Sequence, residues 1–512
     1  MNIDYKRSSG ILLHISSLYS DYGIGDLGKE AYHFVDQLAS TGATYWQLLP
    51  LGPTGYGNSP YSARSCFAGN ELFINLDYLI NLGLLTKEDL QDKPEFPSSR
   101  VDFNMVYQWK LPLLKKAAST FLLQNKNTKG YKAFLKEAEY WLEDYALFMV
   151  LYEKYNDARW YSIWDKKESV RDKETLNKLR KDKAEELQNW YALQYLFSTQ
   201  WRKLKEYANS KGILLIGDAP IFAGGDSADT WSHLEIFKTD KDGHYSEVSG
   251  VPPDIFSTTG QLWGTPVYDW KVLKDTNYDW WFRRIKQLLS LTDVLRIDHF
   301  RGLDAYYSIP AKDKTAEFGK WVKAPGAEFF KSLTSTYGKL PIIAEDLGLM
   351  TPSVEKLRKS NHFPGMKIAQ FGFTQLVNNE FNAYDNFLPH NYERDYIAYT
   401  GTHDNDTTRG WYNALTDSQK HQVREYLASP DEEIVWSLIR AIMLSHADIA
   451  IVPMQDLLEL DGSARMNYPS TCNDKNWSWR LEKDQFGQYP LSRFTHLVRI
   501  SGRNNKLASE VK

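Results

Sequence analysis

Three acidic residues, Asp298, Glu345 and Asp404, each follow a short apolar run, in VLRIDHFRG, PIIAEDLG and IAYTGTHDND. An apolar run of four to eight residues is typical of a buried parallel strand. The carboxyl ends of such strands meet at one mouth when they form a (β/α)8 barrel, and that mouth is where the barrel carries its chemistry. Two positioned carboxylates are what glycosidic bond cleavage requires, so the pattern predicts that class of reaction.

The first acid has an arginine two residues before it. Arg296 and Asp298 share a face if their segment is a strand, and a guanidinium beside a carboxylate lowers the carboxylate pKa and keeps it ionised. A nucleophilic carboxylate needs that state. His299 and Arg301 begin the loop that follows, where they could donate to sugar hydroxyls. A buried structural Arg–Asp pair is the alternative interpretation of this motif.

The second acid lies among apolar neighbours, which raise the pKa of a carboxyl group toward the range useful for proton donation. Asp346 comes directly after Glu345, and strand alternation places the two on opposite sides. We expect Glu345 to face the mouth and Asp346 to cap a helix or to serve as a loop ligand. Alternatively, both residues only cap a helix that starts near Thr351.

Other chemistries receive less support from the sequence. His403 and Asp404 could suggest a metal, but the chain has no HxH or HExxH and its 11 His are scattered, so we expect no metal. The Gly-rich segment 50–65 is not followed by GKS or GKT, which disfavours a phosphate-binding loop. The absence of GxSxG disfavours a Ser-His-Asp hydrolase.

Charge and composition favour a protein that acts on neither nucleic acid nor membranes. The net charge is −4, and the most basic stretch, 178–188, mixes both signs as a solvated helix face does. Cys66 and Cys472 alone cannot form a disulfide scaffold. The N-terminal segment has no apolar signal core, and no run approaches the ~20 apolar residues of a membrane span. We therefore expect a cytoplasmic protein.

Eight short apolar runs alternate with helical patterns, which predicts an α/β fold with a parallel sheet, and eight strands close a (β/α)8 TIM barrel. The runs are 10–17, 45–51, 213–222, 294–300, 341–348, 366–373, 395–404 and 448–458.

The spacing of the runs predicts insertions in one catalytic barrel that spans 1–512. The interval between the second and third runs far exceeds the ~30 residues of a βα unit, and its amphipathic patterns predict a mostly helical subdomain at 70–185. Residues 223–280, rich in Gly, Pro, Ser and Thr, are expected to form a loop subdomain that acts as a lid. The residues after 458 are too few for a C-terminal β-sandwich.

Six motifs in one order resemble the amylomaltases, the 4-α-glucanotransferases of glycoside hydrolase family 77, which are related to the α-amylases. They are LLPLGPTGYGNSPY, GDAPIF, GVPPDIFSTTGQLWGTPVY, RIDHFRG, IAEDLG and YTGTHDND. The resemblance extends from about Ser9 to Trp479. It implies a (β/α)8 barrel with helical insertions and no C-terminal β-sandwich.

The resemblance also implies roles for individual residues. Asp298 is similar to the family nucleophile, Glu345 to the acid/base and Asp404 to the acid that stabilises the transition state. The residues that match sugar contacts are Asp218, Arg296, His299 and His403 around the attacked glucose, and Tyr61, Asp254, Gln261, Trp263 and Asn467 on the donor and acceptor sides. Tyr56 matches a tyrosine of a second glucan site in some members.

One segment departs from the family pattern: MNYPSTCNDKNWSWR carries Ser470 where members often have glycine, and its turn at Asn473–Lys475 is bulkier and longer. This concerns the acceptor side. The resemblance thus predicts a retaining 4-α-glucanotransferase that transfers segments between maltodextrins, with glucose or maltodextrin as acceptor and no cofactor. An α-glucan hydrolase and a catalytically silent glucan-binding protein remain the alternatives.

Overall fold

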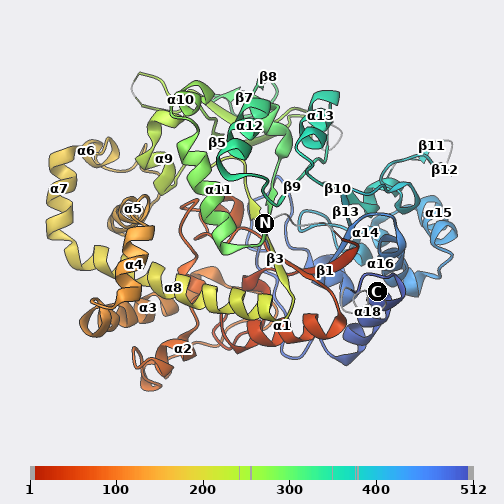
Figure 1. The fold of residues 1–512 in the computed structure, drawn as a ribbon, viewed down its shortest axis with the longest axis horizontal. Helices are drawn as coiled ribbons and strands as arrows, with labels where there is room; N and C mark the ends of the chain where they lie inside the picture. Colours follow the sequence, from red (N-terminus) through yellow and green to blue (C-terminus); the bar gives the residue numbers. More distant parts are fainter. Residues whose placement is uncertain are drawn as a thin grey trace.

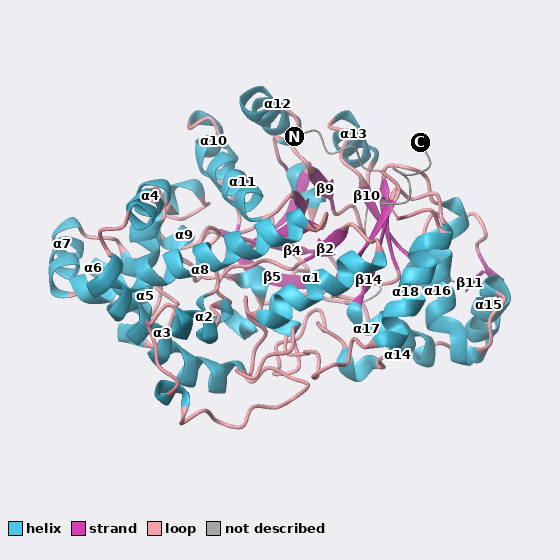
Figure 2. Cartoon of the chain, turned by 60° about the horizontal axis from the view of Figure 1, so that its bottom comes forward, coloured by secondary structure: helices cyan, strands magenta, loops and turns pink. Residues whose placement is uncertain are grey.

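The computed structural model describes residues 6–241, 243–253, 257–348, 350–374, 376–377 and 380–504. Its centre is one parallel sheet of eight strands in the order β10-β13-β14-β1-β2-β3-β6-β9, with helices around it (Figures 1 and 2). The strands are β1 Ser8–Leu12, β2 Tyr45–Gln47, β3 Leu214–Ala219, β6 Val294–Ile297, β9 Ile342–Ala344, β10 Gly365–Ile368, β13 Tyr396–Tyr399 and β14 Ile449–Pro453. Each of the eight predicted runs overlaps a strand of this sheet, and the (β/α)8 barrel is confirmed.

These strands are short and apolar because helices cover them outside and side chains fill the barrel inside. Ile342, Ile343 and Ala344 of β9 are each at most 1% exposed although their side chains alternate between the two faces. Continuous apolar runs of this kind are what parallel strands buried on both faces require. Polar residues follow directly on β6, β9 and β13, where Asp298, Glu345 and Thr400 begin the loops at the mouth.

Between β9 and β10 the barrel is closed by one backbone hydrogen bond and by the side chain of Asp346. The N–H of Ala344 donates to the carbonyl of Pro364 at 2.9 Å. Asp346 Oδ1 accepts from the N–H of Met366 at 2.7 Å, and Asp346 Oδ2 lies 3.1 Å from Nε of the buried Arg358. Asp346 therefore joins the barrel seam, and the expectation that it caps a helix is wrong.

Seven helices occupy the chain between β2 and β3 and form the left side of Figure 1. They are α2 Leu76–Asn81, α3 Phe103–Asn125, α4 Lys129–Glu137, α5 Leu142–Tyr155, α6 Lys166–Ser169, α7 Lys173–Asp182 and α8 Ala184–Ser210. The long helix α8 packs against α3 and α5 and buries Trp190 and Trp201 completely or nearly so. The division of 70–185 as a subdomain stays a prediction.

The segment 223–280 has more regular structure than the sequence suggested. It contains α9 Ala228–Ser232, β4 Glu247–Val251, β5 Gln261–Pro266 and α10 Trp270–Asp275. With β7 Ala305–Pro310 and β8 Lys320–Lys323, β4 and β5 form an antiparallel sheet in the order β5-β4-β7-β8. Gly, Ser and Thr make these strands hard to recognise in the sequence, and β4 pairs on one side with β7, which lies in the distant segment 305–323.

The remaining helices cover the barrel or follow its last strand. They are α1 Lys29–Thr41, α11 Asp279–Leu291, α12 Gly326–Tyr337, α13 Pro352–Ser360, α14 Thr408–Ala414, α15 Asp417–Leu427, α16 Ile434–Leu444, α17 Met454–Leu457 and α18 Gln488–Ile500. The short strands β11 Leu376–Val377 and β12 Glu380–Phe381 pair antiparallel. From β14 to residue 504 the described chain contains no strand, in agreement with the predicted lack of a β-sandwich. Within the described ranges, no helix has the length and apolar character to cross a membrane.

A glycine-rich segment before α1, GIGDLG at 23–28, matches the GxGxxG pattern of dinucleotide-binding turns, and the sequence argument against nucleotides overlooked it. Packing accounts for two of its glycines. A Cβ at Gly25 would lie 1.9 Å from the carbonyl oxygen of Ile15, and one at Gly28 would lie 2.2 Å from the amide nitrogen of Asn75. These close approaches explain the pattern without a ligand.

The seam carboxylate can be tested by mutation. Asp346→Ala removes the bond to Met366 and leaves the buried Arg358 without its counter-charge, so we expect a loss of about 3–5 kcal/mol in the free energy of unfolding. Asp182→Ala breaks an ion pair with Lys178 in which both side chains are more than half exposed, and should cost less than about 1 kcal/mol. Urea denaturation of both variants measures the difference. Equal losses would contradict a role for Asp346 in closing the barrel.

Candidate active site

A cavity of about 600 Å³ opens where β3, β6 and β13 end. Its lining residues come from the loops after these strands and after β2, from β5 and the segment before it, and from the segment 467–477. Those that the sequence analysis named are Tyr56, Tyr61, Gln261, Trp263, Asp298, His299, His403, Asp404, Asn467 and Ser470. The structure therefore brings most of the predicted site residues into one cleft. Asp254 lies outside the described residues.

Strand register places the first two acids side by side. β6 and β9 are parallel neighbours in which Ile297 is paired with Ala344. Asp298 and Glu345 are the next residue on each strand, so the register brings them together at the mouth. Neighbouring strands lie about 4.8 Å apart, which sets the scale of the separation between the two residues.

Asp298 is held by an arginine that it shares with another acid. Arg296 Nη2 lies 2.9 Å from Asp298 Oδ1, while Arg296 Nη1 donates to both oxygens of Asp218 at 2.7 and 2.6 Å. Asp218 and Arg296 are also paired in register across β3 and β6. Both are buried, at 2% and 3% exposure, whereas the side chain of Asp298 is 27% exposed. The structural ion pair is thus Arg296–Asp218, and Asp298 is the member that reaches the cavity.

This sharing changes the expected titration of Asp298. Burial raises its pKa, the Arg296 guanidinium opposes that rise, and the negative charges of Asp218 and Asp404 add to it. Arg296 does lower the pKa of Asp298, as predicted, but its effect is smaller than the combined effect of burial and the neighbouring acids, so the net shift is upward. One guanidinium cannot compensate two carboxylates and the loss of water around them.

Glu345 accepts two backbone hydrogen bonds at the end of β9. Its Oε2 accepts from the N–H of His299 at 2.7 Å, and its Oε1 accepts from the N–H of Leu347 at 3.0 Å. His299 has a left-handed backbone, with φ at 49°. Burial, together with the charge of Asp298, raises the pKa of Glu345 in spite of these bonds. The apolar setting seen in the sequence has the predicted effect, and a carboxyl group of this kind holds a proton near neutral pH.

Asp404 has the opposite environment. Although burial disfavours its charge, His403 and Asn467 hold the pKa of Asp404 well below its usual range. Asn467 Nδ2 donates to Asp404 Oδ1 at 2.7 Å, and His403 Nε2 lies 3.3 Å from Asp404 Oδ2. Asp404 in turn raises the pKa of His403 against the effect of burial. The site therefore contains one carboxylate that stays ionised and one carboxyl group that favours its protonated form.

Aromatic rings line two sides of the acids. Tyr61 donates its hydroxyl to Asp218 Oδ2 at 2.7 Å, and its ring stacks on His403 with centroids 5.1 Å apart. Trp263, on β5, meets His299 edge-on at 4.8 Å and donates to Gln261 Oε1 at 3.3 Å. Trp263 is 38% exposed, so it is not a core residue that only fixes the loop. Flat apolar faces of this kind suit sugar rings.

Comparison with known proteins agrees with this geometry. The family model described as 4-alpha-glucanotransferase matches residues 13–485. The 4-alpha-glucanotransferase of Clostridium butyricum is 44% identical over 496 residues, covering 96% of this chain and 100% of that protein. The enzyme of the same name from Thermus thermophilus is 44% identical over 489 residues, covering 94% and 95%. The structure of the amylomaltase of Streptococcus agalactiae in complex with acarbose superposes with a TM-score of 0.93 at 39% identity, covering 98% of this chain and 100% of that one.

The chain belongs to the 4-alpha-glucanotransferase family. It is accordingly a transglycosidase, as the resemblance predicted.

The segment that departs from the family pattern lies at the rim of the cleft of this 4-alpha-glucanotransferase. Ser470 has φ at 63°, in the left-handed region that glycine favours, so the serine keeps a glycine-like backbone. Cys472 is exposed, and its thiol contacts the exposed Tyr56, whose pKa it raises. A Cβ added at Gly57 would meet Cys472 Sγ at 3.0 Å. The two rim turns of the transferase therefore touch each other beside the cavity.

Two residues beside the transferase site, Trp477 and Arg465, were not apparent from the sequence. Trp477 packs near both Tyr61 and His403, with ring centroids 5.5 and 5.9 Å apart. Arg465 Nη2 donates a hydrogen bond to the backbone carbonyl of Asp404. Both lie in or beside the segment MNYPSTCNDKNWSWR, where their proximity to Asn467 was the available signal. Over the described residues, no group of three or more His, Cys, Asp or Glu side chains is placed to hold a metal.

The opposite shifts of Glu345 and Asp404 predict opposite pH effects on stability. The folded state raises the pKa of Glu345, so it binds that proton more tightly than the unfolded chain, and wild-type stability falls as pH rises between the two pKa values. Glu345→Gln removes this penalty, so its stability relative to wild type should rise from about pH 5 upward, by about 1 kcal/mol per unit of pKa shift.

Asp404→Asn is the control, because its stability relative to wild type should depend on pH in the opposite direction. The lowered pKa of Asp404 contributes stability above its unfolded pKa and loses that contribution as pH falls. The variant should therefore be less stable than wild type at pH 7, and the difference should shrink below about pH 4. Urea titrations of the three proteins from about pH 2 to about pH 9 measure both effects. Parallel curves for the two variants would contradict the assigned environments.

Proposed function

We propose that this chain is a retaining 4-α-glucanotransferase that moves α-1,4-glucan segments between maltodextrins through a covalent glucosyl-enzyme. The observation that carries the proposal is the placement of Asp298 and Glu345 at the adjacent ends of β6 and β9. A strand spacing of about 4.8 Å fits the ~5–5.5 Å separation of the carboxyl groups of retaining enzymes and not the ~6.5–9.5 Å of inverting ones.

In the proposed first half-reaction, Asp298 attacks the anomeric carbon while Glu345 gives its proton to the departing glycosidic oxygen. The raised pKa of Glu345 supports its role as acid. In the second half, the 4-hydroxyl of an acceptor glucan displaces Asp298, and Glu345 takes the hydroxyl proton, so that the enzyme regains its starting state. Asp404, kept ionised beside His403, is proposed to bind ring hydroxyls and to stabilise the transition state.

The remaining residues are proposed to bind sugar or to position residues that do. Tyr61, His299, His403, Gln261, Trp263 and Asn467 line the cavity, while Asp218 and Arg296 lie beneath it and are proposed to act through Tyr61 and Asp298. The assignment of Asp254 stays a prediction. The acarbose in the Streptococcus agalactiae amylomaltase supports an oligosaccharide in this cleft. We propose maltodextrin as donor and glucose or maltodextrin as acceptor; a cytoplasmic location stays a prediction.

Removal of the proposed nucleophile tests the mechanism. Asp298→Asn should lower turnover of maltotriose by several orders of magnitude and leave the affinity for maltodextrin largely unchanged, because only the attacking carboxylate is lost. Asp304→Asn, in the same loop region and outside the cavity lining, is the control and should retain most activity. Chromatography of the products over time measures both. Near-normal transfer by Asp298→Asn would refute the assignment.

The same chromatography separates the proposal from its alternatives. A transferase converts maltotriose into glucose and a ladder of longer maltodextrins. A hydrolase yields only shorter products, and a catalytically silent protein leaves maltotriose intact while still binding it.

The lid role proposed for Trp263 has its own test. Transfer must compete with water at ~55 M, so the intermediate has to be shielded until an acceptor binds. Trp263→Ala should therefore raise the ratio of hydrolysis to transfer with little change in melting temperature. Trp321→Ala is a matched control, because Trp321 lies on the same small sheet with 39% exposure but outside the cavity lining. An unchanged ratio in Trp263→Ala would remove the lid role.

A further inference from the structure

The loop that carries His403 and Asp404 is fixed at both of its ends by one buried carboxylate. Asp456, on α17, is 1% exposed. Its Oδ2 accepts from the hydroxyls of Thr400 and Thr408 at 2.6 Å each, and its Oδ1 accepts from the N–H of Thr408 at 2.7 Å. Both ends of the loop are thus held to the segment after β14. The middle of the loop, which carries His403 and Asp404, must be positioned by other contacts.

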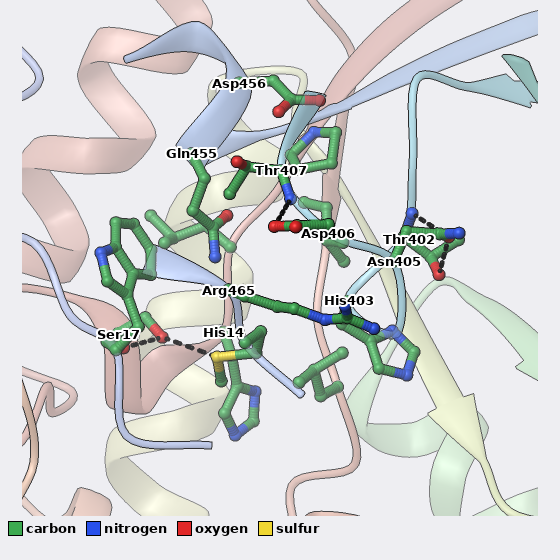
Figure 3. Close-up of a pocket in the computed structure, with 16 residues that line it drawn as sticks. His14, Ser17, Thr402, His403, Asn405, Asp406, Thr407, Gln455, Asp456 and Arg465 are labelled. Carbon is green, nitrogen blue, oxygen red and sulfur yellow. Dashed lines mark hydrogen bonds between the residues drawn. The ribbon is translucent and has the colours of Figure 1, made fainter. Parts of the chain in front are cut away.

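Arg465 supplies a contact to that middle. Its Nη2 donates to the backbone carbonyl of Asp404 at 2.6 Å, and its Nε donates to the backbone carbonyl of Asn467 at 2.6 Å. Figure 3 shows its side chain extending from the segment after η11 (Gly462–Ala464) toward the loop of His403. One planar guanidinium therefore joins two loops that follow different strands.

The two residues that Arg465 joins also bond each other through their side chains. Asn467 Nδ2 donates to Asp404 Oδ1 at 2.7 Å. The backbone bonds to Arg465 fix the separation of the two residues, and the side-chain bond then sets the direction of the Asp404 carboxylate. Arg465 itself lines a separate small cavity of about 30 Å³, with His14 and Asp406, and not the large cleft (Figure 3).

We propose that Arg465 is a positioning residue for the transfer reaction, which holds Asp404 and Asn467 in the register that lets Asp404 act on the sugar ring. It acts through these two residues and does not contact the substrate. The inference rests on the proposed role of Asp404. A lysine cannot replace this arginine, because an ammonium lacks the fixed fork that reaches two carbonyl oxygens at once.

The test compares Arg465→Lys with Arg409→Lys. Arg409 is a matched control because its Nη1 and Nη2 also donate to two backbone carbonyls, those of Asp431 and Glu432, at 2.8 Å each, and it lies outside the lining of both cavities. We expect kcat of Arg465→Lys on maltotriose to fall about 10- to 100-fold, as for a misplaced catalytic group. Its KM and melting temperature should change no more than those of Arg409→Lys, whose kcat should remain near wild type.

A sugar donor whose leaving group departs without protonation shows whether Arg465 acts through Asp404 or through the proposed acid Glu345. With α-glucosyl fluoride, the loss in Arg465→Lys should persist if Arg465 positions Asp404, whereas recovery of wild-type rate would mean that the acid Glu345 was disturbed and would overturn the proposal. In a double-mutant cycle with Asn467→Ala, the combined loss should be smaller than the product of the separate losses. Independent, multiplicative losses would also overturn it.

Failure of this inference can be told from failure of the proposed function. If Asp404→Asn is inactive but Arg465→Lys resembles Arg409→Lys, the positioning role is wrong and the role of Asp404 stands. If Asp404→Asn itself turns over maltotriose at a near-normal rate, the proposed function of Asp404 is wrong.

Discussion

The sharing of one buried guanidinium between two acids is the interaction on which the proposed chemistry depends. Arg296 commits one nitrogen to both oxygens of Asp218 and the other to Asp298. The cluster has an excess of negative charge in a poorly hydrated place, which is costly and is offset only by close geometry. Burial and this excess charge together raise the pKa of Asp298, and burial together with the charge of Asp298 raises that of Glu345. The same group of charges at the barrel mouth therefore helps Glu345 to keep its proton.

The parallel sheet converts this charge cluster into a site with fixed distances. Asp218 is paired with Arg296 across β3 and β6, and the same register brings Asp298 beside Glu345 across β6 and β9. Closure between β9 and β10 depends on the neighbouring Asp346, so the residue after the proposed acid/base helps to complete the barrel. A one-residue slip in the register of these strand pairs would separate the charged side chains at their ends. The strand pairing that stabilises the barrel therefore also sets the geometry of the site.

The third acid is built differently, because its strand β13 does not adjoin β6 or β9 in the sheet. Asp404 lies in a loop, and loops take their position from side-chain contacts instead of strand register. Asp456, Asn467 and Arg465 supply those contacts from the segment after β14. The small antiparallel sheet brings Trp263 over the opposite side of the mouth, against His299. The cleft therefore combines a rigid half made by register with a half assembled from loops.

The sequence by itself determined the eight barrel strands and the acids that follow three of them, because a parallel strand buried on both faces is mostly apolar and its end before an acid is visible as a change of composition. It also indicated Tyr61, Trp263 and the histidines of the cleft through the resemblance of whole motifs. Only the tertiary structure decided that Arg296 divides its charge, that Asp346 closes the seam, that 223–280 contributes strands to a sheet with 305–323, and that Arg465 and Trp477 belong beside the site. Each of these depends on a partner distant in the chain, and such pairings leave no local periodicity in the sequence.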